Sequence, residues 1–151
     1  MKILVFSVIS VFLLLVLSQC GPVRQMPDSK ILSVEYVKQG TRVYPDKVRS
    51  FSLQPDGQYK AYMADNGEEA DSIMCGAEVA DKIFECLKKG KIKNYKERYK
   101  PTMRIHDGYT WSIKVKFEKG ESITSGGYMA YPNDFSAVKG FIDIIEGLFK
   151  K

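Results

Sequence analysis

The chain has 151 residues, of which 44% are hydrophobic and 27% charged, and its formal net charge at pH 7 is +5. This length is that of one ordinary domain with room for a hydrophobic core. The modest positive charge favours anionic surfaces slightly but does not indicate nucleic-acid binding, so we expect no nucleic-acid partner.

Residues 1–19 have the composition of a secretory signal peptide. Lys2 supplies a short basic end, an apolar run extends from Ile3 to Leu17, and small or polar residues follow. The run is shorter than the roughly 18 apolar residues expected of a membrane-spanning helix. We therefore predict an exported protein that loses this segment, rather than one that keeps it as a membrane anchor.

Leu17-Ser18-Gln19-Cys20 resembles the lipobox of bacterial lipoproteins, in which the cysteine is lipidated. Leu17, Ser18 and Cys20 match the pattern, whereas Gln19 departs from the usual Gly, Ala or Ser. The resemblance implies a diacylglyceryl group on the Cys20 thiol and a third acyl chain on its amine. Each buried methylene contributes about 0.8 kcal/mol, so such an end stays in the membrane. The alternative is an ordinary secreted protein in which Cys20 is incidental.

Gly21 to Ser29 is polar and contains Pro22 and Pro27, which predicts a flexible tether. Residues 20–29 thus comprise the cysteine whose lipidation the resemblance implies and this tether. Surface-bound lipoproteins of Bacteroidota typically carry an acidic cluster after the cysteine, and Gly21 to Gln25 has none. By that resemblance we expect an outer-membrane lipoprotein of the cell envelope that faces the periplasm. The membrane is then one partner, and residues 30–151 form the folded domain.

Alternating apolar residues predict three strands, at Ile31 to Val37, Val48 to Leu53 and Gln58 to Met63. Pro55-Asp56-Gly57 predicts the turn between the second and third strands, because proline presets one backbone angle and glycine accepts a positive one. The acidic segment Asp65 to Asp71 is typical of a loop.

One long helix is predicted next, capped by Asp71 or Ser72 and ending at Gly90. Cys75 and Cys86 would both lie on it, roughly 16 Å apart. Since a disulfide requires Cα atoms within about 7 Å, we expect two free thiols that pack as small hydrophobic groups. The apolar stripe of this helix consists of Ile73, Ala77, Ala80, Phe84 and Leu87.

The segment Lys88 to Lys100 is the most basic of the chain, with Ile92, Tyr95 and Tyr99 at helical spacing. One interpretation is a patch that contacts anionic lipid headgroups or an acidic partner. The other, which we favour, is a solvated connector whose apolar residues dock on the core while its lysines face water.

His106 is the only histidine of the chain and lies in a polar loop. A hydrolase can use such a histidine as a base, or the carboxylates of Asp65 to Asp71 as an acid and base pair. The spacing singles out no nucleophile, however, and the acidic segment does not match a calcium loop. One histidine and two core cysteines make no credible zinc site, so we expect no metal and no other cofactor.

Residues 109–132 predict a β-hairpin with one buried face, formed by Trp111 to Phe117, and a turn at Lys119-Gly120. The adjacent glycines in its second half indicate a bulge or a close approach of backbones. Glycine, tyrosine and proline gather there, so we expect an interaction surface formed by Ser125, Gly126, Gly127, Tyr128, Tyr131 and Pro132.

A closing helix is predicted after Pro132, with Asn133 as its cap. Its apolar stripe would cover the buried face of the hairpin. The stripe consists of Phe135, Val138, Ile142, Ile145 and Phe149.

Tyr99 and Pro101 precede Asp107-Gly108-Tyr109 and Trp111, and Ser125-Gly126-Gly127-Tyr128 with Ala130-Tyr131-Pro132 then leads to the last helix. This arrangement resembles an uncharacterised family of small exported or lipid-anchored proteins from Bacteroidota. Met129 stands where the pattern of that family has Asn. The resemblance implies an exported location and a shared fold, and it transfers no catalytic residue.

The order strand, strand, strand, helix, strand, strand, helix predicts one α+β domain, with an antiparallel sheet of about five strands and two main helices on one face. We expect a non-catalytic binding module that contacts an envelope protein or a glycan. The alternative is a small envelope hydrolase that uses His106 or the acidic loop Asp65 to Asp71.

Overall fold

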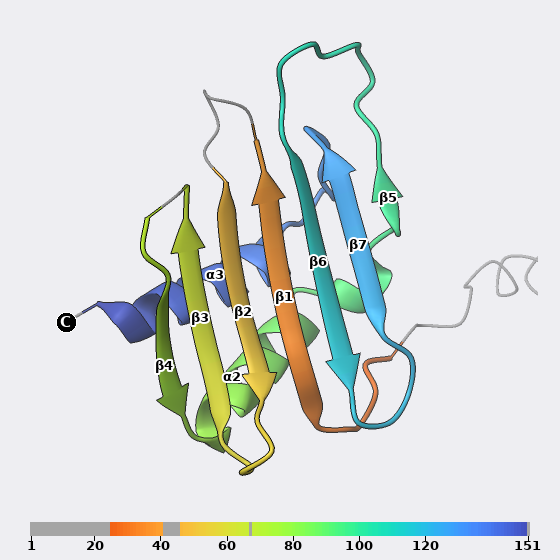
Figure 1. The fold of residues 1–151 in the computed structure, drawn as a ribbon. Coiled ribbons are helices and arrows are strands. Elements are labelled where there is room, and N and C mark those ends of the chain that lie inside the picture. The colour runs from red at the N-terminus through yellow and green to blue at the C-terminus, as the bar shows by residue number, and fades with distance from the viewer. Residues whose placement is uncertain (1–24, 41–45, 67, 151) are drawn as a thin grey trace, which may run out of the picture.

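The computed structural model describes residues 25–40, 46–66 and 68–150, which form one seven-stranded sheet with two helices on one of its faces (Figure 1). The predicted signal peptide and Cys20, the predicted lipidation site, lie outside the described residues. The elements are β1 (Ile31–Gln39), β2 (Lys47–Leu53), β3 (Tyr59–Asp65), β4 (Asp71–Cys75), α2 (Ala77–Lys89), η1 (Ile92–Asn94, a 3-10 helix), β5 (Arg98–Tyr99), β6 (Thr110–Phe117), β7 (Ile123–Tyr128) and α3 (Ser136–Phe149).

The first strand lies in the middle of the sheet, where β1 pairs with β2 on one side and with β6 on the other. The order across the sheet is β4-β3-β2-β1-β6-β7-β5, and all neighbours are antiparallel except β5 and β7. The predicted α+β class and the two helices on one face are therefore confirmed. The sheet is mixed and has seven strands, whereas about five were predicted. The two strands that were not predicted are β4 and β5.

Strand β4 occupies residues that were predicted to begin a long helix. Residues Asp71 to Cys75 pair with β3, and α2 begins only at Ala77, after Gly76. The predicted caps Asp71 and Ser72 are therefore wrong. The apolar spacing of Ile73 and Cys75 fits a strand as well as a helix, and the backbone groups of β3 offered this segment hydrogen-bonding partners.

The two cysteines consequently lie on different elements, but both are free, as predicted. The Cys75 thiol ends β4 and donates to the Tyr59 carbonyl oxygen at 3.6 Å, whereas the Cys86 thiol of α2 faces the Ala137 carbonyl oxygen at 3.9 Å. The predicted outcome was thus right although its premise of one shared helix was wrong.

The core lies between the sheet and the two helices. Alternate residues of β6, from Trp111 to Phe117, are buried as predicted, and the residues between them are exposed. Burying each such side chain fully contributes roughly 1.5–3 kcal/mol. The helices cover this face with apolar side chains, the buried ones being Val79, Ala80, Ile83, Leu87, Ala137, Val138, Phe141 and Ile145.

A buried arginine joins the sheet to the closing helix. Arg49 of β2 is only 1% exposed, and its guanidinium donates to Asp65 at 2.5 and 3.1 Å and to Glu146 at 2.7 and 3.1 Å. Asp65 was predicted to belong to an acidic loop, but it ends β3 and serves this ion pair. A buried charge requires such compensation, since desolvation of an unpaired guanidinium is costly.

Helix α3 begins later than predicted. Its first residue is Ser136, and the Asp134 carboxylate, rather than Asn133, accepts a hydrogen bond from the Ser136 backbone N–H at 2.9 Å. Because the helix begins after Phe135, this side chain can turn toward the sheet, where its ring contacts that of Trp111 edge-on at 4.8 Å between centroids.

The basic segment after α2 is not one helix, because it forms η1 and then β5. Ile92 and Tyr95 are buried while Lys91 and Lys96 are exposed, so its apolar residues dock on the core as in the favoured interpretation.

The end of the predicted tether also contacts the domain, since Met26 packs against the core and the Lys119 backbone N–H donates to the Ser29 hydroxyl at 2.7 Å.

Candidate binding surface on the open sheet face

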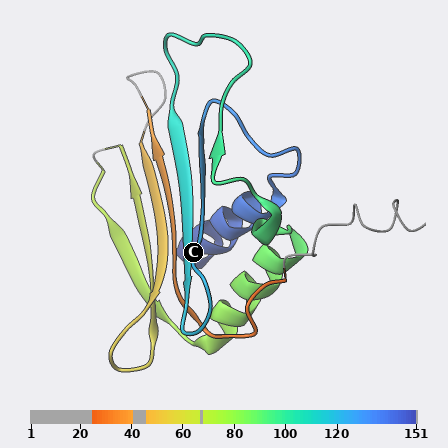
Figure 2. The ribbon, with the colours of Figure 1, turned by 90° about the vertical axis from the view of Figure 1, so that its right-hand side faces the viewer.

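The sheet has one covered and one open face, because both helices pack on the same side (Figure 2). Successive residues of a strand point to opposite faces, so the open face holds those residues that alternate with the buried ones. Apolar members of this face include Val37, Val48 and Met74. Most of the others are hydroxyl-bearing or charged, among them Ser33, Glu35, Ser50, Ser52, Lys60, Thr110, Ser112, Lys114 and Lys116.

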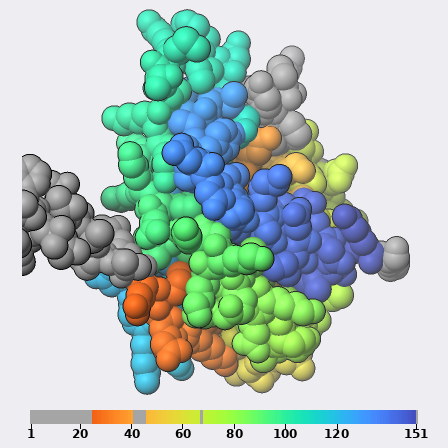
Figure 3. All heavy atoms as spheres, turned by 180° about the vertical axis from the view of Figure 1, so that it is seen from behind, coloured from red at the N-terminus to blue at the C-terminus, as the bar shows by residue number. Residues whose placement is uncertain are grey.

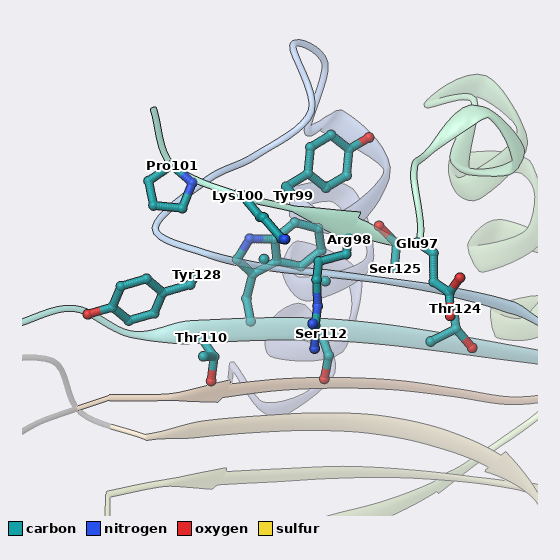
Figure 4. A pocket seen from close by; sticks show the side chains of 13 residues that line it. Glu97, Arg98, Tyr99, Lys100, Pro101, Thr110, Ser112, Thr124, Ser125 and Tyr128 are labelled. Atoms are coloured by element: carbon teal, nitrogen blue, oxygen red, sulfur yellow. The ribbon is translucent and has the colours of Figure 1, made fainter. Parts of the chain in front are cut away.

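A hollow opens on this face where β5, β7 and β6 lie side by side (Figure 4). Arg98, Gly126 and Ser112 are neighbours in one row across these three strands. Gly126 has no side chain to fill the row, and the Arg98 side chain lies across β7 toward Ser112 (Figure 4). The polar side chains around the hollow belong to Glu97, Arg98, Lys100, Thr110, Ser112, Thr124 and Tyr128.

The two glycines bring backbones close together and do not form a bulge. The pairing of β6 with β7 continues without a shift through Gly126 and Gly127. A Cβ on Gly126 would lie 2.7 Å from the Trp111 carbonyl oxygen, and one on Gly127 would lie 3.0 Å from the Tyr99 Cβ. Of the two alternatives predicted for these glycines, close approach is therefore confirmed and the bulge is wrong.

The charged side chains of the hollow are mainly cationic. Arg98 and Lys100 contribute two positive charges, Glu97 contributes one negative charge, and threonine and serine hydroxyls surround them. Guanidinium groups bind carboxylates and phosphates through paired N–H donors, and ammonium groups bind them as point charges. The lining therefore suits a polar ligand that carries negative charge.

One end of the hollow is tied to the loop between β5 and β6. The Tyr128 hydroxyl donates to the Ile105 carbonyl oxygen at 3.3 Å, which holds the tyrosine against that loop. Since β6 and β7 are paired over six residues of each strand, most of the lining is fixed by regular sheet hydrogen bonds.

The predicted interaction surface is divided between the two faces of the sheet. Gly126, Gly127 and Tyr128 line the hollow, and Ser125 also borders it, but Ser125 is 1% exposed and its hydroxyl donates to the Lys96 carbonyl oxygen at 2.7 Å. Tyr131 lies on the covered side. Its ring stacks on Trp111 at 5.9 Å between centroids, and Pro132 follows it into the connection to α3.

An aromatic cluster on the covered side explains the tyrosine in that connection. Trp111 donates its indole N–H to the Ala130 carbonyl oxygen at 2.8 Å, and its ring contacts those of Tyr99, Tyr131 and Phe135. The cluster fixes the path from β7 to α3, so this part of the predicted surface supports the fold.

The residues of the hydrolase alternative lie apart from one another. His106 is exposed in the loop between β5 and β6, whereas Cys75 ends β4 at the opposite end of the sheet (Figure 1). The Ser125 hydroxyl and the Asp65 carboxylate are engaged in the contacts described above. Within the described residues, no group of three or more His, Cys, Asp or Glu side chains is placed to hold a metal ion.

The thiols are also poorly suited to nucleophilic chemistry. Burial raises the pKa of both Cys75 and Cys86, and nearby carboxylates, Glu78 and Asp143 respectively, raise it further. A thiol with a raised pKa holds less of its reactive thiolate at neutral pH.

Arg98 and Lys100 were not predicted as site residues, because the apolar residues of their segment have a helical spacing. The alternation of Arg98, Tyr99 and Lys100 about a partly buried tyrosine is a strand signal, but it spans too few residues to stand out. Ser112 and Thr124 carried no signal beyond their place on the polar side of the hairpin.

The sequence matches no protein-family model and shows no significant similarity to a curated protein. Among the helices of the described residues, none is both long and apolar enough to cross a membrane.

Proposed function

We propose that the protein is a lipid-anchored binding module of the cell envelope, held in the outer membrane through Cys20 and facing the periplasm. The apolar run that ends at Leu17 and the lipobox-like residues before Cys20 support the anchor. The ligand is a carboxylate or phosphate group carried by an envelope protein or a glycan, and the protein binds it without catalysis.

The row of Arg98, Gly126 and Ser112 is the observation that carries this proposal. The glycine leaves space over the sheet, the arginine borders that space, and neighbouring hydroxyls offer further hydrogen bonds. Most of the lining belongs to paired strands, so the site is formed before the ligand arrives and ordering costs little on binding.

Binding is favoured over hydrolysis because the polar groups gather at the hollow while the candidate catalytic groups are dispersed. His106 is outside the lining, and Ser125, which borders the hollow, turns its hydroxyl to the covered side.

Site-specific photo-crosslinking in intact cells tests the position of the binding site. A crosslinker at Ser112, in the hollow, is compared with one at Ser72, an exposed serine on the same face but on β4. We expect adducts from position 112 alone. Their sensitivity to protease or to glycosidase distinguishes a protein from a glycan ligand. Equal adducts at both positions, or none at position 112, would contradict the proposed site.

Substitutions test the charge of the ligand. Loss of one charge-assisted hydrogen bond costs about 1.5–3 kcal/mol, so Arg98→Ala and Lys100→Ala should each weaken binding about tenfold or more. Lys114→Ala, an exposed lysine on the same face outside the lining, is the matched control. Thr124→Tyr should block the hollow sterically. Unchanged binding by all three hollow variants would refute the assignment.

Palmitate labelling tests the anchor independently. The wild type should incorporate the label and Cys20→Ala should not; equal labelling would remove the lipoprotein assignment.

A further inference from the structure

A second hollow lies on the helical side, where the first described residues meet α2 and η1. Figure 3 shows these N-terminal residues on the surface beside the segment that follows α2. Met26 and Phe84 contribute apolar side chains to the lining, and Lys88, Lys91 and Lys93 contribute three positive charges. Asp28 is the one carboxylate in that lining, so the surface has a net positive charge.

The fold fixes the positions of these lysines. Ile92 is fully buried and holds η1 to the core, so Lys91 and Lys93 lie on either side of an anchored residue. Lys91 adopts a left-handed backbone conformation, with φ of 53°, at the turn between α2 and η1. Lys88 lies in the last turn of α2, and its 4.0 Å contact with Glu85 joins two largely exposed side chains, so that contact neutralises little of the charge.

Chain length places this surface near the membrane. Gln25 borders the hollow, and only five peptide units connect it to Cys20. A fully extended segment of that length spans at most about 18 Å. Lysines attract an anionic membrane only within roughly a Debye length, about 8 Å at physiological salt. The short tether lets the surface reach this layer, and the attraction then keeps the lysines in it.

We propose that the basic surface formed by Lys88, Lys91 and Lys93 docks on anionic lipid headgroups of the membrane that holds Cys20. This inference rests on the proposed lipid anchor. Docking turns the helical layer to the membrane, and because the helices and the open sheet face lie on opposite sides (Figure 2), the hollow at Gly126 then faces away from the lipid.

Lysine footprinting tests the docking. The lipidated protein is reconstituted in vesicles of phosphatidylcholine alone or with phosphatidylglycerol, and its amines are acetylated and quantified by mass spectrometry. Each lysine near an anionic surface strengthens association about fivefold, so Lys88, Lys91 and Lys93 should be protected at least fivefold in the phosphatidylglycerol vesicles. High salt should abolish the protection. Lys114 and Lys116, on the open face, should label equally in both vesicles.

A triple variant provides the matched perturbation. Lys88→Gln and Lys93→Gln remove charge, and Lys91→Asn does so with a residue that tolerates the left-handed conformation. The variant should still float with both kinds of vesicle, because its lipid anchor is unchanged. It should no longer take up the salt-sensitive orientation in which the helical layer faces the membrane. The control, with Lys60, Lys114 and Lys116 each replaced by Gln, should retain it, and unchanged urea midpoints show that both fold.

The outcomes separate docking from anchoring. Equal labelling of the three lysines in both vesicle types overturns docking while leaving the anchor intact. Failure of the wild type to float with phosphatidylcholine vesicles overturns the anchor and with it the docking. Protection in isolated envelopes without protection in phosphatidylglycerol vesicles indicates an acidic protein partner and overturns docking on lipid.

Discussion

Glu146→Gln should destabilise the domain because it leaves the buried Arg49 with one carboxylate instead of two. Glu146 Oε1 accepts from both Nε and Nη2 of Arg49, and the arginine side chain is 2% exposed while that of the glutamate is 29% exposed. Hydrogen bonds to charged groups contribute about 1.5–3 kcal/mol. Glutamine keeps the acceptor oxygen, and solvent screens part of the charge, so we expect a loss of about 1–2 kcal/mol.

Urea unfolding at pH 7 measures this loss as a lower midpoint at constant slope. Glu85→Gln is the matched control, because Glu85 also lies on a helix and faces a lysine, but both side chains of that pair are at least 60% exposed. It should cost less than about 0.5 kcal/mol. In an Arg49→Met background, Glu146→Gln should cost almost nothing. An equal cost for Glu146→Gln and Glu85→Gln, or a full cost without Arg49, would refute the reasoning.

Three further predictions concern stability and the thiols. Trp111→Ala should cost about 3–5 kcal/mol in urea unfolding, because the indole is 2% exposed; little loss of stability would contradict its place in the core. Hydrogen bonding to Arg49 lowers the pKa of Asp65, so that carboxylate stabilises the fold at pH values above its unfolded pKa and ceases to do so as the pH falls through its folded pKa. The midpoint difference between wild type and Asp65→Asn should therefore shrink between pH 7 and pH 3, and a constant difference would oppose this account. Cys75 and Cys86 should react slowly with a thiol reagent in the native protein at pH 8 and both react fast after unfolding without reductant; fewer than two thiols would indicate a disulfide.

The sequence predicted correctly those elements in which apolar residues recur at a regular strand or helix spacing. The apolar alternation extends through all of β6, and the apolar stripe extends over several turns of α3. Both patterns can be recognised from residues that are close together in the sequence. Residues 71–75 were wrongly predicted to be helical. Ile73 alternates with Cys75 as in a strand, but it also continues the apolar helical stripe of α2. Pairing with β3 decided between them, and that pairing is not visible locally.

The candidate site was only partly predictable for the same reason. The glycines of β7 indicated close approach, but the hollow requires Arg98 to lie beside Gly126 through a parallel pairing of just two residues. Likewise, nothing near Arg49 in sequence identifies Glu146 as its partner. These contacts join distant segments, and their energies depend on burial that only the assembled sheet provides.

The central place of β1 has a consequence for how the chain folds. Strand β1 can complete its pairing only when β6, from the last third of the chain, has arrived, since Val34 lies opposite Val115. The chain loses the entropy of closing this long loop before the β1–β6 contacts can stabilise it. Folding is therefore slower than for a sheet built from successive hairpins. A fragment that ends after β3 therefore leaves one edge of β1 without its partner strand, and the sheet is completed only when residues 110–117 pair with it.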